Sequence, residues 1–249
     1  MLIRKDDDGS AIAIGQASHA WISGQLARAW GNESFGAVEP WEEVCLGAEQ
    51  HDVGWALWDA QPTLNRDTGL PYTFIELPLE PRLEIWSGAA ARLVSQSRYA
   101  ALLVSMHGTA LHERYGPADR RELHEYLAAE RAFQEELAAT LGADPEEVRR
   151  NQRLVWTWDS LSLALCLDWD ATTLNEVPAA DGLLSLDLAP LGGGRAELEP
   201  WPFRRDTVRL RAEGRRLAER YEDEARMHAA LEAAPWVTLD FELARRDRY

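Results

Sequence analysis

The sequence predicts an α+β fold that is mostly helical, with one small β-sheet. Apolar residues recur every three or four positions through most of residues 17–167, the spacing that collects them on one face of a helix. Apolar and polar residues alternate instead over residues 208–212 and 237–243, as in strands with one buried face. The chain has 249 residues, of which 46% are apolar, so it can form a single domain with one core.

The first elements are predicted from local signals in chain order. Residues 1–15 are expected to form a β-hairpin, because two short apolar segments flank a turn at residues 6–9. A segment rich in proline and glycine predicts a long loop over residues 59–82. Helical spacing predicts helices on both sides of this loop, over residues 17–30, 40–58, 83–96, 99–107 and 119–141.

The second half of the chain begins with a strong helix start. Asp144-Pro145-Glu146-Glu147 offers a capping residue and a proline in the first turn, and it predicts a helix to about Leu167. Three glycines at 192–194 mark a break, after which two strands flank a helix near 215–233. We therefore expect one domain over residues 1–249, with a helical core over 16–170 and a β-containing appendage packed on it over 1–15 and 195–249.

Charge and cysteine content narrow the class of partner. The formal net charge is −16, and such an acidic surface argues against a nucleic acid or an anionic membrane as the main partner. Cys45 and Cys166 are far apart in apolar segments, so we expect buried free thiols in a reducing compartment. The sequence shows neither a signal peptide nor an apolar run of about 18 residues. We expect a cytoplasmic protein that binds a small molecule; the oligomeric state stays open, a homodimer included.

Polar residues interrupt several of the predicted helices. His51 and Asp52 lie together in the apolar helix predicted over 40–58, where neighbouring side chains are about 100° apart and can converge on one ion. Asp159 lies in the middle of another apolar run, and burial should raise the pKa of an unpaired carboxyl there. His19 lies in the first predicted helix and His107 at the end of a third. A metal would explain these residues; buried ion pairs or helix caps are the structural alternative.

The order of these residues resembles a known superfamily. A histidine, a His-Asp doublet and a distal aspartate, each from a different helix, bind a metal in the HD superfamily of metal-dependent phosphohydrolases. Residues 17–170 show this order in His19, His51-Asp52 and Asp159. The resemblance implies an HD-domain-like helical core in which these four residues bind a divalent ion. Imidazole and carboxylate ligands without a thiolate favour Mn, Fe, Zn, Co or Ni.

Longer segments point to a narrower family. Gln16-Ala17-Ser18-His19, Gln50-His51-Asp52-Val53-Gly54-Trp55 and Ser105-Met106-His107 are similar to a bacterial family known as domain of unknown function 3891. This resemblance extends over nearly the whole chain. It implies the same HD-like core and carries no activity with it.

The superfamily resemblance implies a metal-dependent hydrolase that acts on a small phosphorylated compound. Asp52 would bridge the metal and a water molecule, and His107 would contact the leaving group or a second ion. The loop over 59–82 is expected to cover a substrate pocket, with four further residues in its wall: Trp55, Trp58, Asp59 and Trp158.

Two alternative functions stay open. One is an HD-like di-iron oxygenase, which needs further histidines; His107 could serve, with His112 and His124 as weaker candidates. The other is a non-catalytic module that binds a metal or ligand between tryptophans, of which the chain has eleven.

Overall fold

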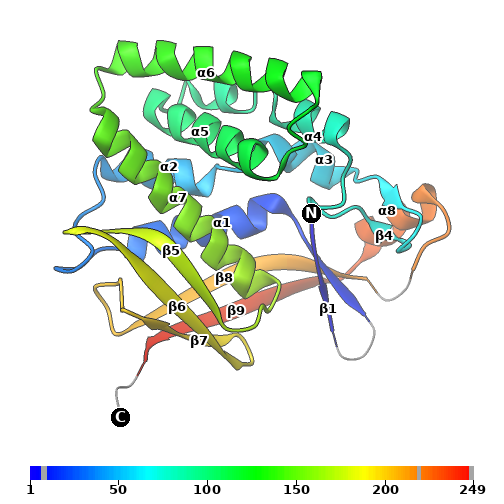
Figure 1. The fold of residues 1–249 in the computed structure, drawn as a ribbon. Helices are drawn as coiled ribbons and strands as arrows, with labels where there is room; N and C mark the ends of the chain where they lie inside the picture. The colour runs from blue at the N-terminus through cyan, green and yellow to red at the C-terminus, as the bar shows by residue number, and fades with distance from the viewer. Residues whose placement is uncertain (7–9, 218–219, 247–249) are drawn as a thin grey trace.

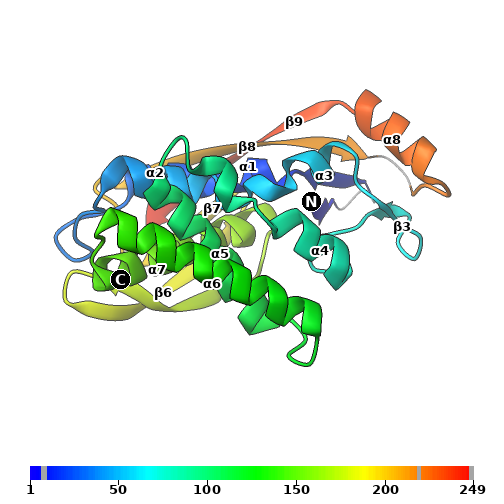
Figure 2. The ribbon, with the colours of Figure 1, turned by 90° about the horizontal axis from the view of Figure 1, so that it is seen from above.

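The computed structural model describes residues 1–6, 10–217 and 220–246. Figure 1 shows a layer of helices lying over one face of a twisted sheet, and Figure 2 shows the same layers from above. The elements in chain order are β1 (Leu2–Lys5), β2 (Ala11–Ile14), α1 (Gln16–Ala29), α2 (Trp41–Glu49), η1 (Val53–Trp55), α3 (Ala56–Ala60), β3 (Leu64–Asn65), β4 (Leu70–Pro71), α4 (Leu79–Trp86), η2 (Ala90–Leu93), α5 (Arg98–Tyr115), α6 (Arg121–Leu141), α7 (Pro145–Cys166), β5 (Thr172–Ala179), β6 (Gly182–Gly192), β7 (Arg195–Glu199), β8 (Thr207–Leu217), α8 (Glu224–Ala233) and β9 (Trp236–Arg245).

The sheet is larger than predicted. It has seven strands in the order β1-β2-β8-β9-β7-β6-β5, so the expectation of a small sheet is wrong, while the α+β class is confirmed. The neighbouring strands are antiparallel except β7 and β9, which are parallel. The sheet also takes in residues 172–192, where no strand was predicted. Leu184, Leu186 and Leu188 alternate with polar or exposed positions there, and this alternation is the signal that predicts β6.

The N-terminal hairpin is confirmed. Leu2 pairs with Ile14 and Lys5 with Ala11, and β2 then pairs with β8 to join the hairpin to the main sheet. The predicted turn lies partly at residues 7–9, outside the described residues.

The long helix before the sheet begins as predicted. Asp144 accepts a hydrogen bond from the backbone N–H of Glu146 at 2.9 Å, and Pro145 occupies the first turn of α7. Helix α5 is longer than predicted and continues to Tyr115, so His107 lies in its interior and not at its end. Helices α1 and α7 pack on the sheet against β8 and β5, and α5 packs on both α7 and α6.

The helix predicted over residues 40–58 is interrupted. Helix α2 ends at Glu49, and His51 and Asp52 lie in a turn before η1. The His51 imidazole donates from Nδ1 to the carbonyl of Ala48 at 2.7 Å, although in a continued helix this carbonyl would accept from the N–H of Asp52. The turn therefore replaces the predicted helix and carries the doublet on irregular backbone.

One large apolar core joins the helices to the sheet. Trp30 lies at its centre, with edge-to-face contacts to Phe35, Trp158 and Phe203. Cys45 and Cys166 are free and buried, as predicted. Among the described residues, no helix is both long and apolar enough to cross a membrane.

Candidate metal centre and its cavity

Five polar side chains from four separate segments of the chain meet in the helical layer. His19 comes from α1, His51 and Asp52 from the turn after α2, His107 from α5 and Asp159 from α7. Each is at most 5% exposed. Two sets of three lie close enough to hold an ion, His19-His51-Asp52 and His51-His107-Asp159. The structure thus brings together the four residues predicted to bind a metal, and it adds His107 to them.

The backbone fixes the hydrogen on His51. A carbonyl oxygen only accepts, so the contact with Ala48 requires that Nδ1 of His51 carries the hydrogen. The lone pair of the neutral ring then lies on Nε2, which has no hydrogen-bond partner among the described residues. This atom lies 3.4 Å from Asp159 Oδ1 and 3.6 Å from Asp52 Oδ2. A buried histidine held this way by a carbonyl is a common arrangement of a metal ligand.

A chain of hydroxyl groups orients His19. Ser162 donates its hydroxyl hydrogen to the carbonyl of Asp159 at 2.8 Å, and Ser23 donates to Ser162. With its only hydrogen in use, Ser162 Oγ accepts from Nδ1 of His19 at 2.7 Å. Nε2 of His19 lies 2.7 Å from Asp52 Oδ2. A neutral His19 would therefore present a lone pair to a carboxylate, an arrangement that a cation bound by both atoms stabilises.

In the metal-free protein, a proton supplies positive charge to this cluster. Burial lowers the pKa of His51, but the charge of Asp52 and the contact with Asp159 outweigh it and raise the pKa to about 9. Burial raises the pKa of Asp159, yet the close contact with His51 Nε2 at 3.4 Å and the charge of His51 overcome burial and hold it at about 2. The pKa of Asp52 is lowered as well, against the effect of burial, chiefly by His51. Both carboxylates are therefore ionised at neutral pH.

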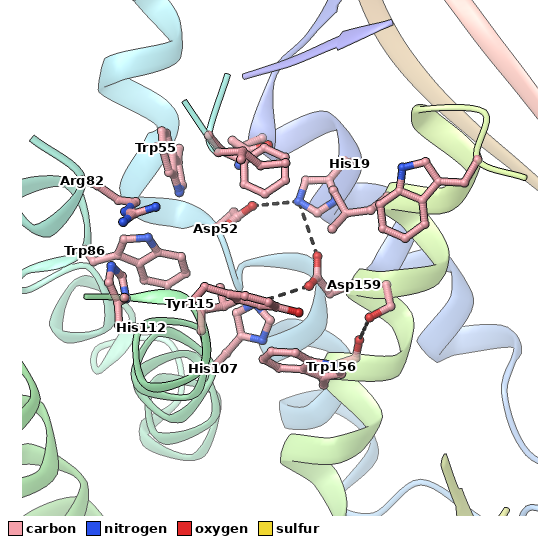
Figure 3. A pocket seen from close by; sticks show the side chains of 18 residues that line it. His19, Asp52, Trp55, Arg82, Trp86, His107, His112, Tyr115, Trp156 and Asp159 are labelled. Atoms are coloured by element: carbon pink, nitrogen blue, oxygen red, sulfur yellow. Dashed lines mark hydrogen bonds and ion pairs between the residues drawn. The ribbon is translucent and has the colours of Figure 1, made fainter. Parts of the chain in front are cut away.

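The cavity beside this cluster is large enough for a small molecule. Its volume is about 540 Å³, within the range of roughly 300–1,000 Å³ for ligand sites. His19, Asp52, His107 and Asp159 lie on one side of it (Figure 3). Most of the remaining wall is apolar or aromatic, and it includes Trp55, Phe74, Ile75, Trp86, Leu111, Tyr115, Trp156 and Trp169.

Two glycines allow the aromatic wall to approach the cluster. A Cβ on Gly54 would lie 2.4 Å from the carbonyl oxygen of Ile85, so only glycine lets α4 pack against η1 at this distance. A Cβ on Gly108 would lie 2.7 Å from the ring of Trp86. Gly54 belongs to the same short segment as His51 and Asp52, and this explains why the segment ends in Val-Gly-Trp. The close packing places side chains of α4 in the cavity wall.

Of the four residues predicted to line a pocket, Trp55 lies in the cavity wall and the other three lie outside it. Trp55 lines the cavity, whereas Trp58 lies behind it with ring centroids 5.5 Å apart. Asp59 accepts a hydrogen bond from the backbone of Gln16 and pairs with the amino group of Met1 at 3.1 Å. Trp158 is fully buried in the main core. Of the predicted loop over 59–82, the side chains of Phe74, Ile75 and Arg82 reach the cavity.

Apart from His112, which was a weaker candidate, several residues in the cavity wall or beside the cluster were not singled out from the sequence. Arg82 and Trp86 are four residues apart on α4, a spacing that places them on one helix face and could have grouped them. Ser162 follows Asp159 by three residues on α7, so it also shares a face with it. His112 lines the cavity and is 3% exposed, whereas His124 is exposed on α6.

The cluster offers ligands for one ion with His51 in its coordination. Nδ1 of His51 is committed to Ala48, so only Nε2 is free. The two sets of three residues share this single nitrogen, and they cannot both hold an ion through it. The donor set of imidazole and carboxylate, buried and with fixed ring orientations, fits a divalent first-row metal.

Fold and site together define an α+β protein with a buried His/Asp cluster that opens onto an aromatic cavity. The chain belongs to the family described as "Protein of unknown function (DUF3891)", whose model matches residues 1–219. This match contains all the residues of the cluster and the cavity wall. No curated protein and no solved structure matches the chain. The function is therefore argued from the site itself.

Proposed function

We propose that this protein is a metal-dependent hydrolase of HD type that acts on a small phosphorylated compound. The observation that carries the proposal is the unpartnered Nε2 of His51, buried between two ionised carboxylates at 3.4 and 3.6 Å. The order His19, His51-Asp52, Asp159 agrees with the metal ligands of the HD superfamily. A divalent ion held there would lower the pKa of a water molecule and polarise a phosphoryl oxygen.

The protein's own residues would orient the reaction. Asp52 faces the cavity and the cluster at once, so its second oxygen is available to accept a proton from water. Burial lowers the pKa of His107 to about 4, which keeps the ring neutral at pH 7. His107 would then contact the substrate beside the cluster as a neutral hydrogen-bonding group. The apolar wall excludes bulk water from the rest of the substrate.

Elemental analysis of protein purified without an affinity tag tests the metal. We expect about one equivalent of Mn, Fe, Zn, Co or Ni per chain. Less than about a tenth of an equivalent, with no uptake of any of these ions, would contradict the site. The metal-loaded protein is then assayed on phosphomonoesters, phosphodiesters and nucleotides, with the metal-free protein as control.

An HD-like oxygenase is the second candidate, because His107 joins the cluster and most of the cavity wall is apolar. The single free nitrogen of His51 counts against it. If His51 binds the first ion, a second ion would have only His107 and Asp159 as ligands. The same substrate panel run with and without air separates the two. Hydrolysis that proceeds equally in both supports our proposal, and turnover only in air would support the oxygenase.

A further inference from the structure

The side of the cavity away from most of the cluster carries an unpaired cation. Arg82 comes from α4 and is partly buried in the wall, and its Nε has no hydrogen-bond partner among the described residues. Burial lowers the pKa of Arg82, and no carboxylate contributes to raise it. Arg150 and Arg215 are also partly buried without a carboxylate partner, but both donate to backbone carbonyls. An anion from outside the chain would fit Arg82.

Two further unpartnered groups lie in the same wall. Trp55 Nε1 is a buried N–H donor with no acceptor in the described part of the chain, and Figure 3 shows Trp55 on the same side as Arg82. His112 donates from Nδ1 to the carbonyl of Gly108 at 2.8 Å, so its Nε2 carries a lone pair and is likewise without a partner. The positive charge of Arg82 helps to lower the pKa of His112. The side chains of Arg82 and His112 lie in the same cavity wall as Trp86, whose ring contacts that of His112.

We propose that Arg82, with Trp55 and His112, binds an oxyanion group of the substrate in the part of the cavity wall formed by α4, η1 and α5. A bare oxyanion would be repelled by the lone pair of His112, so the bound group must also offer a hydroxyl hydrogen. A monoprotonated phosphate and a hydroxycarboxylate both have this combination. That the bound anion belongs to a substrate rests on the proposed function. That an anion binds at Arg82 does not.

The shape of the cavity adds the third feature of the ligand. Trp86 and Trp156 line the wall together with Tyr115, which stacks on Trp156 at a centroid distance of 6.4 Å. These rings fit an apolar or aromatic spacer. The predicted substrate class is therefore a small molecule that carries a hydroxylated anion beside a flat apolar or aromatic group.

The test uses metal-free protein, so that no anion binds through an ion at the cluster. Tryptophan fluorescence and calorimetry follow the binding of mandelate, phenyl phosphate, phenylacetate and mandelamide. Mandelate and phenyl phosphate distinguish a carboxylate from a phosphate, and titration at about pH 5.5 keeps most of the phosphate monoprotonated, since its second pKa is about 6. Phenylacetate lacks the hydroxyl of mandelate, and mandelamide lacks the charge. Metal content is measured separately, so failure of the metal site and failure of the anion site give different results.

We expect mandelate or phenyl phosphate to bind wild-type protein more tightly than the neutral and hydroxyl-free analogues. Arg82→Gln should weaken the binding of that anion by about tenfold or more, because a charged hydrogen-bond donor is lost. The same change should leave the affinity for mandelamide unaltered. Arg92→Gln is the matched control, because Arg92 is exposed on η2 and does not line the cavity. Arg82→Lys keeps the charge and should lose less, which covers the case in which Arg82→Gln folds poorly. Equal affinity of wild type and both Arg82 variants for the anions, or preference for mandelamide, would overturn the proposal.

Discussion

Replacing Asp159 by asparagine separates its two roles, as ligand and as partner of His51. The change preserves the shape of the side chain and removes its charge. In the metal-free protein the pKa of Asp159 is held at about 2, against 3.8 for a free side chain. One pKa unit corresponds to about 1.4 kcal/mol, so the ionised carboxylate contributes roughly 2–3 kcal/mol to folding at pH 7.

The sign of this contribution follows from the direction of the shift. A carboxyl whose pKa is lowered in the folded state stabilises the fold at any pH above its pKa in the unfolded state, which is near 4. This stabilisation is lost as the pH falls from about 4 toward 2. The sequence alone suggested the opposite, because burial should raise the pKa of a lone carboxyl. His51 reverses the shift. Metal-free Asp159→Asn should therefore be less stable than metal-free wild type at pH 7, although removal of a merely buried charge would stabilise it.

Urea unfolding with chelator and with saturating metal measures both roles. At about a thousand times Kd, a bound ion adds roughly 4 kcal/mol to wild type, and Asp159→Asn should lose most of this gain as well. Asp206→Asn is the control, because Asp206 is exposed and remote from the cluster. Unchanged metal content together with unchanged metal-free stability in Asp159→Asn would refute the assignment of Asp159 as ligand and ion-pair partner.

Three further predictions concern the same site. Metal binding near pH 7.5 should release about one proton from His51, whose pKa is raised to about 9, and calorimetry in buffers of different ionisation enthalpy measures this release. The free energy of unfolding of the metal-free protein should fall by roughly 3 kcal/mol as the pH rises from 6.5 through 9, because only the folded protein keeps the proton on His51 over this range. It should also fall as the pH drops from 6.5 toward 4. The reason is that His107 and His112, with pKa values lowered to about 4, stay neutral only in the folded protein. Urea titrations across this pH range check both slopes, and a flat profile above pH 6.5 would show that His51 is not protonated. Gly54→Ala should cost about 1–3 kcal/mol, since its Cβ would collide with the carbonyl of Ile85; thermal melts give the loss, and an unchanged melting temperature would argue against the close approach of α4.

The candidate ligands could be predicted because they violate a strong rule. His19, His51, Asp52 and Asp159 are polar residues at positions where helical spacing requires apolar ones, and each such exception needs a partner. The helix start at Asp144-Pro145 was equally readable, since it depends on residues adjacent in sequence.

The local geometry at the doublet could not be predicted in this way. The break after Glu49 involves a local hydrogen bond from the His51 side chain to the carbonyl of Ala48. It also involves the approach of α4 to Gly54, which is a tertiary contact. For the same reason the role of Arg82 was hidden. The sequence placed Arg82 at the end of the predicted loop over 59–82, whereas it lies in α4. Only the packing of α4 against η1 shows that its side chain lines the cavity with Trp55.

The charges within the cluster determine how many ions it can hold. Asp52 and Asp159 contribute two negative charges, His107 is neutral, and the proton on His51 leaves a net charge of about −1 on these four groups. One divalent ion that displaces this proton makes them neutral, which is the favourable state for groups that are at most 5% exposed. A second divalent ion would add two uncompensated positive charges to a cavity that already contains Arg82. These charges therefore favour one ion at the cluster by itself, and any second ion would have to arrive together with an anionic ligand.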